Sequence, residues 1–327
     1  MEQLLQKIFT GDRRAIARAI TLVENRDPAR FKLLTGLSSA GSAAHVIGIT
    51  GSPGAGKSSL VDRLITGYRK RGMKVGIIAV DPSSPFSGGA LLGDRIRMQQ
   101  HATDPGVFIR SMGSRGSLGG LAPATGEAVK VLAAGGKDIV LIETVGVGQS
   151  EMEIMKLADT TVVVLTPGAG DSIQTIKAGI MEIADVFAIN KADLPGAKRL
   201  AREVRGMLHM NGSALSWCPP VMETETVNGY GIKELAEKIE GHREYLVQSG
   251  ELEERRQRRA GDETVETMLA IMREWLGRNT QNDGFIGEVM TRLRAGYYAP
   301  YDAAEVILKE IFSGGFNAKE GEFPWQQ

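Results

Sequence analysis

The sequence predicts an α/β fold in which a mostly parallel central sheet is flanked by helices. Short runs of β-branched residues alternate with stretches of helical length, which is typical of parallel strands joined by crossover helices. A glycine-rich loop separates the first such strand from the first such helix. Helix formers dominate on either side of this region. We therefore expect an N-terminal helical extension and linker at 1–44, the α/β domain at 45–245 and a C-terminal helical arm at 246–327.

Residues 2–25 are predicted to form two short helices, because apolar side chains recur there at helical spacing. Gly11 can end the first helix, and Asp12 can cap the second. We expect Pro28 to close this helical segment. The stretch 36–44 is rich in Gly, Ser and Ala, which is typical of a linker into a new domain.

Seven runs of apolar and β-branched residues are the candidate strands of the sheet. They lie at 45–50, 74–80, 107–110, 138–143, 161–166, 185–190 and, more weakly, 220–223. Stretches of helical length separate most of them, as after Lys57 and after Ala124. Strands that alternate with helices in this way are parallel, with helices on both faces of the sheet.

The C-terminal part has a different character. Residues 236–278 are almost all helix formers, and 283–294 and 302–312 could be two further helices. A helical arm this thin cannot bury a core of its own, so it more often packs on a partner than stands alone.

The charge balance argues against a nucleic-acid or membrane partner. Lys plus Arg equals Asp plus Glu at 39 each, so no global basic field attracts either one. The apolar runs are of strand length, far below the ~20 residues that span a bilayer. The first residues lack the apolar stretch of a secretory signal, so we expect a soluble, cytoplasmic protein.

The chain has one cysteine, Cys218, which cannot form an internal disulfide and is expected to be a small buried residue. This fits a reducing compartment. The four histidines are scattered along the sequence, so the sequence predicts no zinc-type ligand set.

The loop at 51–58 matches the phosphate-binding pattern G-x-x-x-x-G-K-[ST] in full and places the α/β domain in the P-loop NTPase class. Its glycines let backbone N–H groups face a β-phosphate, and the helix that follows adds positive partial charge. Lys57 should reach the β- and γ-phosphates, and Ser58 should bind Mg²⁺. The expected nucleotide contacts here are Gly51, Ser52, Pro53, Gly54, Ala55, Gly56, Lys57, Ser58 and Ser59.

A second motif, Asn190-Lys191-Ala192-Asp193, follows an apolar strand, at the edge where an open parallel sheet binds ligands. It resembles the guanine-reading N-K-x-D element of G proteins. Guanine presents two donors, N1–H and the 2-amino group, that the Asp193 carboxylate can accept together. Adenine has no such pair and would leave the carboxylate unpaired.

The run 138–142 ends in Glu143, followed by the glycine-containing loop Thr144–Gln149. An acid at the tip of a buried strand is the expected layout for a magnesium-side carboxylate, and Gly146 can offer its N–H to the γ-phosphate. Most G proteins have Asp where this chain has Glu143.

Two more acids lie between the second and third strands. Asp81, at a strand tip, could join the magnesium shell. Asp94, on a loop, could contribute only after closure of that loop, and it could equally be a helix cap.

In combination these motifs resemble the MeaB/ArgK family, the metallochaperone P-loop GTPases associated with methylmalonyl-CoA mutase. The likeness rests on the phosphate loop and five further runs, and it extends from about residue 16 to about 250. The runs are Val80-Asp81-Pro82-Ser83-Ser84, Leu92-Gly93-Asp94-Arg95, the run from Glu143 to Glu151, Pro167-Gly168-Ala169-Gly170-Asp171 and Asn190-Lys191-Ala192-Asp193.

The resemblance implies roles for residues that their types alone do not assign. Lys57 and Ser58 would contact phosphate and Mg²⁺, and Asp81, Asp94 and Glu143 would be the acids that hold the metal and the attacking water. The loop 168–177 would be a further switch that couples nucleotide state to a partner. The expected switch residues are Gly148, Gln149, Asp171 and Lys177.

The sequence departs from the family where a small pair of residues backs guanine O6. This chain reads Met222-Glu223-Thr224-Glu225-Thr226 there. A Glu near the base edge could reshape that contact, so Thr226 is the candidate contact, with its backbone N–H still able to serve.

The implied function is GTP binding and hydrolysis, with GTP/GDP and Mg²⁺ as cofactors, in association with an adenosylcobalamin-dependent acyl-CoA mutase. The family gates delivery of the cobalamin cofactor, protects or reactivates the mutase, and forms a homodimer through the C-terminal arm. Two alternatives stay open: a transport-system kinase of the LAO/AO type, and a nickel-insertion GTPase. The chain lacks the catalytic-loop pattern of kinases, which argues against the first alternative. The second needs metal-storing Cys and His residues that the chain does not supply.

Overall fold

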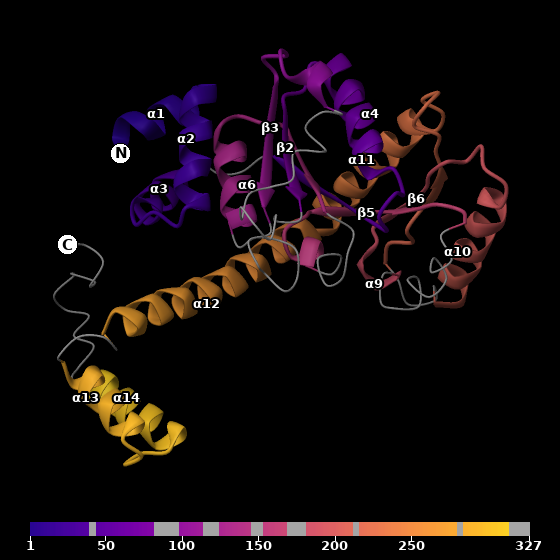
Figure 1. Cartoon of the computed structure of the whole chain (residues 1–327). Helices are drawn as coiled ribbons and strands as arrows, with labels where there is room; N and C mark the ends of the chain where they lie inside the picture. Colours follow the sequence, from indigo (N-terminus) through magenta and orange to yellow (C-terminus); the bar gives the residue numbers. More distant parts are fainter. Residues whose placement is uncertain are drawn as a thin grey trace. The chain divides into compact units, whose positions relative to one another are not determined.

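The computed structural model of the chain (Figure 1) describes residues 1–38, 44–81, 98–113, 124–144, 153–168, 181–211, 216–279 and 284–313. The chain divides into two compact units. The first is Met1–Arg256, and the second begins at Gln257.

A seven-stranded sheet forms the centre of the first unit, and every neighbouring pair of strands is parallel. The α/β fold predicted from the sequence is confirmed, and all seven candidate runs are strands. In sheet order they are β3 (Val107–Gly113), β2 (Val75–Asp81), β4 (Ile139–Glu143), β1 (His45–Thr50), β5 (Thr160–Leu165), β6 (Val186–Ile189) and β7 (Val221–Glu223).

The strand order places β1 at the point where the chain changes direction across the sheet. After β1 the chain forms β2, β3 and β4 on one side, and then β5, β6 and β7 on the other. In open parallel sheets, ligands bind outside the carboxyl ends of the strands at such a point. The topology therefore predicts a ligand site at the residues that follow β1.

Two helices cover one face of the sheet. They are α4 (Lys57–Lys70) and α11 (Ile232–Ser249), which pack against each other and on the central strands. The buried apolar side chains between them include Ile47, Ile49, Leu60, Leu64, Leu141, Val162, Leu235 and Ile239.

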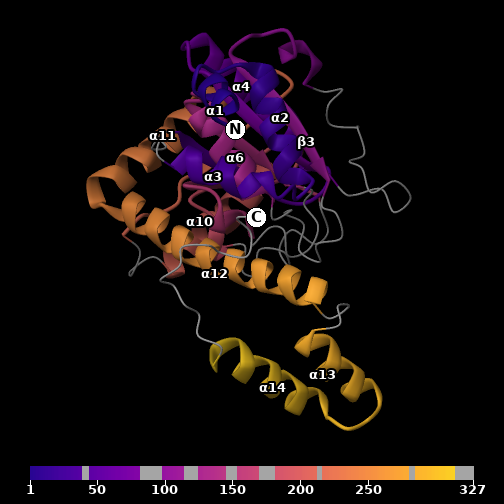
Figure 2. The ribbon, with the colours of Figure 1, turned by 90° about the vertical axis from the view of Figure 1, so that its left-hand side faces the viewer.

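The opposite face carries α6 (Ala124–Ala134) over β2 and β4, and α10 (Ala197–Asn211) with the short α9 (Met181–Ile183) beside β6 and β7. Three N-terminal helices form an outer layer on α6: α1 (Glu2–Phe9), α2 (Arg13–Glu24) and α3 (Ala29–Ser38). Figures 1 and 2 both show α1, α2 and α3 next to α6. The two helices expected in residues 2–25 are present, and Asp12 caps α2 through Ala15 N at 2.7 Å.

α2 ends before Pro28, as expected, but a third helix that the sequence did not predict starts directly after this proline. Asp27 Oδ1 accepts a hydrogen bond from Ala29 N at 2.8 Å, which satisfies one amide of the first turn. Gly36, expected at the start of a linker, lies within this helix. A Cβ there would come within 2.4 Å of Leu5 Cδ1, so the glycine permits the close approach of α1 and α3.

The helix formers at 236–278 belong to two helices. Gly250, with φ of 82°, separates α11 from α12 (Glu251–Asn279). Positive φ is accessible to glycine at little cost, so the chain turns sharply at this residue.

The first turns of α12 are bound to the starts of β5 and β6 by two ion pairs. Arg255 Nη1 lies 3.2 Å from Asp185 Oδ1, and Arg256 Nη2 lies 2.8 Å from Asp159 Oδ2. Both carboxylates also accept backbone N–H groups within the sheet, from Thr161 and Val46. The start of α12 is thus part of the first unit.

A buried polar chain lies beside these ion pairs, at the amino ends of the strands. Thr160 Oγ1 is 2.7 Å from His45 Nε2 and 2.8 Å from His242 Nδ1, and all three residues are almost fully buried. Burial lowers the pKa of His45 to about 3. His45 is therefore neutral in the folded protein at neutral pH.

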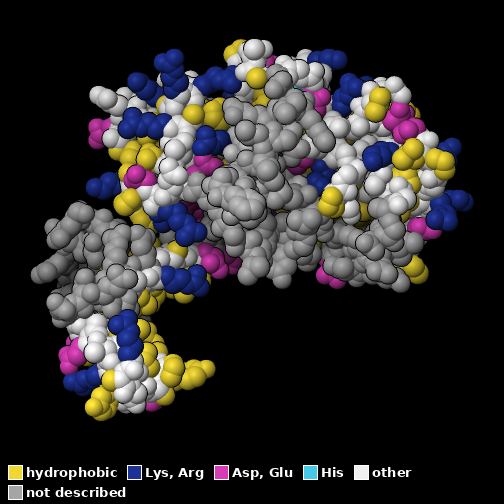
Figure 3. Space-filling view, in the orientation of Figure 1, with side chains coloured by type: hydrophobic (Ala, Val, Ile, Leu, Met, Phe, Trp, Pro, Cys, Tyr) yellow, Lys and Arg dark blue, Asp and Glu magenta, His cyan; other side chains and the backbone are white. Residues whose placement is uncertain are grey.

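The second unit contains the rest of α12 with α13 (Phe285–Arg294) and α14 (Pro300–Ser313), close to the predicted ranges. Ile286, Val289 and Ala303 are buried where α13 and α14 pack together. Several large apolar side chains in this unit are exposed, and hydrophobic atoms are visible over α13 and α14 in Figure 3. They are Val265, Met268, Leu269, Phe285, Tyr297, Tyr301 and Leu308.

Other expectations from composition can be compared with the described residues. The expectation that Cys218 is buried is wrong, because this residue is exposed in the segment before β7. In the described ranges, no helix is long and apolar enough to cross a membrane. The same ranges hold no group of three or more His, Cys, Asp or Glu side chains that could bind a metal ion.

Acidification should destabilise the folded chain through His45. In an unfolded chain the pKa of the His45 imidazole is about 6.5, whereas the pKa of the buried ring in the folded chain is about 3. Between these values the unfolded chain holds more protons, so the unfolding free energy falls as the pH falls from about 6.5 toward 3. Denaturant titrations across this range measure the slope. His45→Gln should give a flatter slope than the parent chain, and equal slopes would contradict this prediction.

Candidate functional site

The phosphate loop lies between the carboxyl end of β1 and the first turn of α4, at the direction change of the sheet. Two of its glycines have positive φ and no room for a side chain. A Cβ on Gly51, at φ 136°, would lie 2.1 Å from the Val164 carbonyl oxygen. A Cβ on Gly56, at φ 90°, would lie 2.3 Å from Asn190 Nδ2. Glycine is therefore required at both positions by close contacts with β5 and with the residue after β6.

Lys57 begins α4, and its side chain folds back over the loop. Its Nζ donates to the Gly51 carbonyl at 2.7 Å and to the Ser52 carbonyl at 3.1 Å, and the residue is only 6% exposed. The ammonium is thus held at the mouth of the loop, where the amino terminus of α4 also favours an anion. This arrangement is suited to phosphate groups.

Ser58 and Glu143 meet beside this lysine. Ser58 Oγ donates to Glu143 Oε1 at 2.6 Å, and both residues are buried. Glu143 is the last residue of β4, in register with Ile49 of β1, so the sheet itself sets this contact. A hydroxyl and a carboxylate are hard oxygen ligands of the kind that Mg²⁺ prefers, so this pair fits a magnesium ion.

The N-K-x-D motif is bound directly to the phosphate loop. Asn190 is fully buried, and its Nδ2 donates to the Ala55 carbonyl at 2.8 Å. Lys191, with φ of 57°, donates through Nζ to the Gly54 carbonyl at 2.8 Å. Asp193 is exposed in the following turn. The structure therefore brings together the two motifs that the sequence identified separately.

The segment after β7 lies against the N-K-x-D motif. The Ala192 N–H donates to the Thr224 carbonyl at 3.0 Å, and Thr224 Oγ1 donates to Asn190 Oδ1 at 3.3 Å. Thr226, the predicted contact, is 9% exposed. The Glu225 side chain, which could have disturbed the base edge, accepts a hydrogen bond from Asn228 Nδ2 within its own turn.

Sequence reasoning missed several polar residues at this edge of the sheet. Thr50, Thr144 and Thr166 follow or end apolar strands and are buried, and Thr144 Oγ1 donates to Thr50 Oγ1 at 3.0 Å. Thr224 lies in the run that departs from the family pattern, and the sequence predicted no role for it. In each case the signal was a small hydroxyl residue at the carboxyl end of an apolar run.

Several predicted residues lie outside the part of the chain that the structure describes. They are Asp94, Gly146, Gly148, Gln149, Asp171 and Lys177. Asp81 ends β2, and its backbone pairs in register with Gly113 of β3. The strand end thus places Asp81 at the carboxyl edge of the sheet, two strands from β1.

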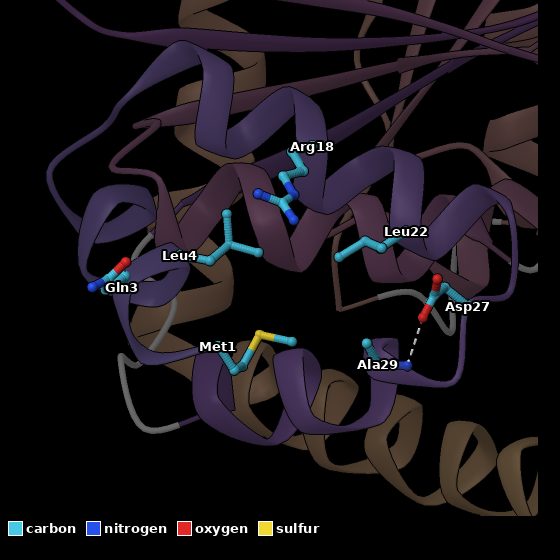
Figure 4. Close-up of a pocket in the computed structure, with 7 residues that line it drawn as sticks. All are labelled: Met1, Gln3, Leu4, Arg18, Leu22, Asp27 and Ala29. Carbon is cyan, nitrogen blue, oxygen red and sulfur yellow. Dashed lines mark hydrogen bonds between the residues drawn. The ribbon is translucent and has the colours of Figure 1, made fainter.

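A separate pocket lies among the three N-terminal helices (Figure 4). Figure 4 shows Leu4 and Leu22 facing its interior, with Arg18 above them and Asp27 at one end. It is lined by Met1, Gln3, Leu4, Arg18, Leu22, Asp27 and Ala29. None of the predicted nucleotide or metal contacts belongs to this set, so the pocket is distinct from the site at β1.

Comparison with known proteins agrees with this geometry. Residues 16–280 match the family model described as methylmalonyl Co-A mutase-associated GTPase MeaB. The chain is 50% identical over 323 residues to a putative GTPase of Pyrococcus abyssi, across 98% of this chain and 99% of that protein. It is 36% identical over 296 residues to GTPase ArgK of Escherichia coli, across 86% and 84% of the two chains.

A solved structure resembles the whole chain. The crystal structure of an LAO/AO transport system kinase matches it with a TM-score of 0.70 and 26% sequence identity, across 95% of this chain and 97% of that one. The likeness thus extends over nearly the full length of both chains.

Gly56→Ala should weaken GTP binding about tenfold or more, because its Cβ would displace the Asn190 amide from the Ala55 carbonyl. Equilibrium titration with GTP measures the effect. Gly67→Ala, on α4, is the matched control, since no atom lies within 4 Å of the added Cβ. It should raise stability by up to about 1 kcal/mol and leave GTP affinity unchanged. Parent-like GTP affinity in Gly56→Ala would contradict the close contact.

Proposed function

Because the chain belongs to the MeaB family of methylmalonyl-CoA mutase-associated GTPases, we propose that it is a GTP-dependent chaperone of an adenosylcobalamin-dependent acyl-CoA mutase. The chain is a GTPase with a P-loop fold, and its family binds guanine nucleotides. In the proposed role, it gates delivery of the cobalamin cofactor and protects or reactivates the mutase. The observation that carries the proposal is the family match over residues 16–280, which includes the whole nucleotide site.

The proposed chemistry is electrostatic stabilisation of phosphoryl transfer to water. Lys57 and the loop N–H groups face the β- and γ-phosphates and stabilise the charge that develops there. Ser58 would hold Mg²⁺, with Glu143 beside it and Asp81 and Asp94 as further acids. When bound, Mg²⁺ neutralises charge on the phosphate oxygens. In this scheme, hydrogen bonds within the protein hold the Lys57 ammonium over the loop and the Glu143 carboxylate beside Ser58.

Guanine selection is assigned to Asp193, whose carboxylate would accept the N1–H and the 2-amino group of the base. Its support is the hydrogen bond from Asn190 to Ala55, which sets the spacing between base and phosphate contacts. Thr226 would lie beside the base of the bound nucleotide. An adenine nucleotide would leave the carboxylate without donors, so ATP should be a poor substrate.

The nucleotide state would be transmitted to the mutase by switch residues. We assign this role to Gly148 and Gln149 after β4, and to Asp171 and Lys177 after β5, whereas the Gly146 N–H would contact the γ-phosphate. Both segments follow strands that pair with β1, and β1 leads into the phosphate loop. Loss of the γ-phosphate at that loop would therefore act on the ends of the two strands that flank β1.

We also propose a homodimer formed through the C-terminal arm. Val265, Met268 and Leu269 are exposed on α12 at helical spacing, at 52%, 52% and 37%. An exposed apolar stripe on a helix in a chain of zero net charge fits the same stripe on a second copy, since a symmetric contact between copies brings like residues together.

Lys57→Ala should lower the GTP hydrolysis rate about a hundredfold or more, because the transferring phosphates lose a fixed cation. Phosphate release under excess GTP measures the rate. Lys70→Ala, at the other end of α4, removes an equal charge outside the loop and should leave the rate unchanged. Near-normal hydrolysis by Lys57→Ala would overturn the assignment of the phosphate loop.

An adenosylcobalamin-dependent acyl-CoA mutase from the same source should raise the GTP hydrolysis rate. The family match implies this class of partner, and intrinsic hydrolysis should be slow because the described residues beside the phosphate loop include no strong base. The measurement compares GTP with ATP, each with and without the mutase. Stimulation by the mutase with GTP but not with ATP supports the proposal. A GTP hydrolysis rate that the mutase leaves unchanged overturns the assignment of the partner but not that of the GTPase activity.

A further inference from the structure

Arg63, on the second turn of α4, holds the loop that follows β7. Its Nε donates to the Thr226 carbonyl at 2.7 Å, and its Nη2 donates to the Val227 carbonyl. One guanidinium thus binds two successive peptide groups. The planar fork of an arginine suits such a paired contact, and lysine cannot reproduce it.

The loop that Arg63 holds is attached to the base-reading motif at its other end. The Thr224 N–H donates to the Ile189 carbonyl, and the Thr224 carbonyl accepts the Ala192 N–H. The loop closes on itself through a pair between Glu225 and Tyr230. The loop ends at Gly231, where a glycine is required because a Cβ would lie 2.1 Å from the Glu223 carbonyl oxygen. The loop therefore has a set position beside the residues that precede Asp193.

The contacts with Arg63 orient the N–H groups of this loop. In a planar trans peptide, the N–H points opposite to the C=O of the same unit. Since the carbonyls of Thr226 and Val227 point toward Arg63, the N–H groups of Val227 and Asn228 point away from it. Within the described residues, neither N–H donates a hydrogen bond, although the N–H groups of Glu225 and Gly229 are used inside the loop. Two donors are left facing away from the arginine.

We propose that Arg63 is a positioning residue for guanine recognition. By holding the two carbonyls, it fixes the N–H groups of Val227 and Asn228 as donors to the O6 carbonyl of the base. The positive charge behind these peptides also polarises them, so that their N–H groups are stronger donors. Asp193 reads the two donors of guanine, and the loop held by Arg63 reads its acceptor.

This inference rests on the guanine binding in the proposed function, and base analogues separate the two halves of recognition. ITP lacks the 2-amino group that Asp193 would accept, but it keeps O6. 6-Thio-GTP keeps both donors and replaces O6 by sulfur, which is a weak acceptor. The ratio of GTP to ITP affinity therefore reports Asp193. The ratio of GTP to 6-thio-GTP affinity reports the loop.

The test is equilibrium titration of the full chain with GTP, ITP and 6-thio-GTP in the absence of any mutase. Arg63→Ala should weaken GTP binding about tenfold and bring the ratio of GTP to 6-thio-GTP affinity close to one. Its ratio of GTP to ITP affinity should match the parent chain. Arg63→Lys should recover only part of the discrimination, since it keeps the charge without the fork. Arg71→Ala, at the C-cap of the same helix and paired with Glu240, is the control and should leave both ratios unchanged.

Three outcomes would overturn the proposal: a parent chain that does not discriminate against 6-thio-GTP, an Arg63→Ala variant that keeps the parent ratio, or an equal loss of both ratios. The last would mean that Arg63 only supports the site as a whole. If Arg63→Ala does not fold, Arg63→Lys gives the same comparison. Because no mutase is present, failure of the chaperone role would leave these results unaffected.

Discussion

The hydrogen bond from Asn190 to the Ala55 carbonyl joins the N-K-x-D motif to the phosphate loop, and the position of these two motifs relative to each other depends on it. It crosses from the end of β6 to the loop after β1, over the strand that lies between them. Both partners are fully buried, so the bond is made away from competing water. It also explains why position 56 must be glycine, since any side chain would occupy the place of the amide. The two motifs that we propose to bind the base and the phosphates are thereby held at one separation.

The two edges of the sheet hold different kinds of polar groups. At the carboxyl edge, Lys57, Ser58 and Glu143 are buried near the mouth of a loop suited to anions. At the amino edge, Asp159 and Asp185 are paired with arginines and accept backbone N–H groups. The strands between these edges are apolar and fully buried. The polar groups that could serve chemistry and those that support the structure are therefore separated by the length of a strand.

Much of the fold could be predicted from the sequence because its signals are local. The strands are continuous apolar runs, and the phosphate loop carries its own glycine spacing, so each could be identified without tertiary information. The third N-terminal helix could not, because Pro28 ends one helix as readily as it precedes the next. Asp27 decides the matter only through its contact with Ala29. The role of Thr224 was equally hidden, since it depends on Asn190, far away in the sequence. Cys218 was expected to be buried from its residue type, and its place in a surface segment overrides that tendency.

The arginine pairs at the start of α12 mean that the nucleotide-binding region does not end where its last sheet-covering helix ends. A polypeptide stopping at residue 245 would keep every strand but lack Arg255 and Arg256. Asp159 and Asp185, whose side chains are 0% and 12% exposed, would stay at the amino edge of the sheet without these cations, and removal of one partner of a buried ion pair destabilises a fold. Solvent reaches the two arginines, which are 35% and 27% exposed, so each loss is smaller than that of a fully buried pair. The first compact unit therefore extends through Arg256, and the arm begins as a structural part of the domain that it leaves.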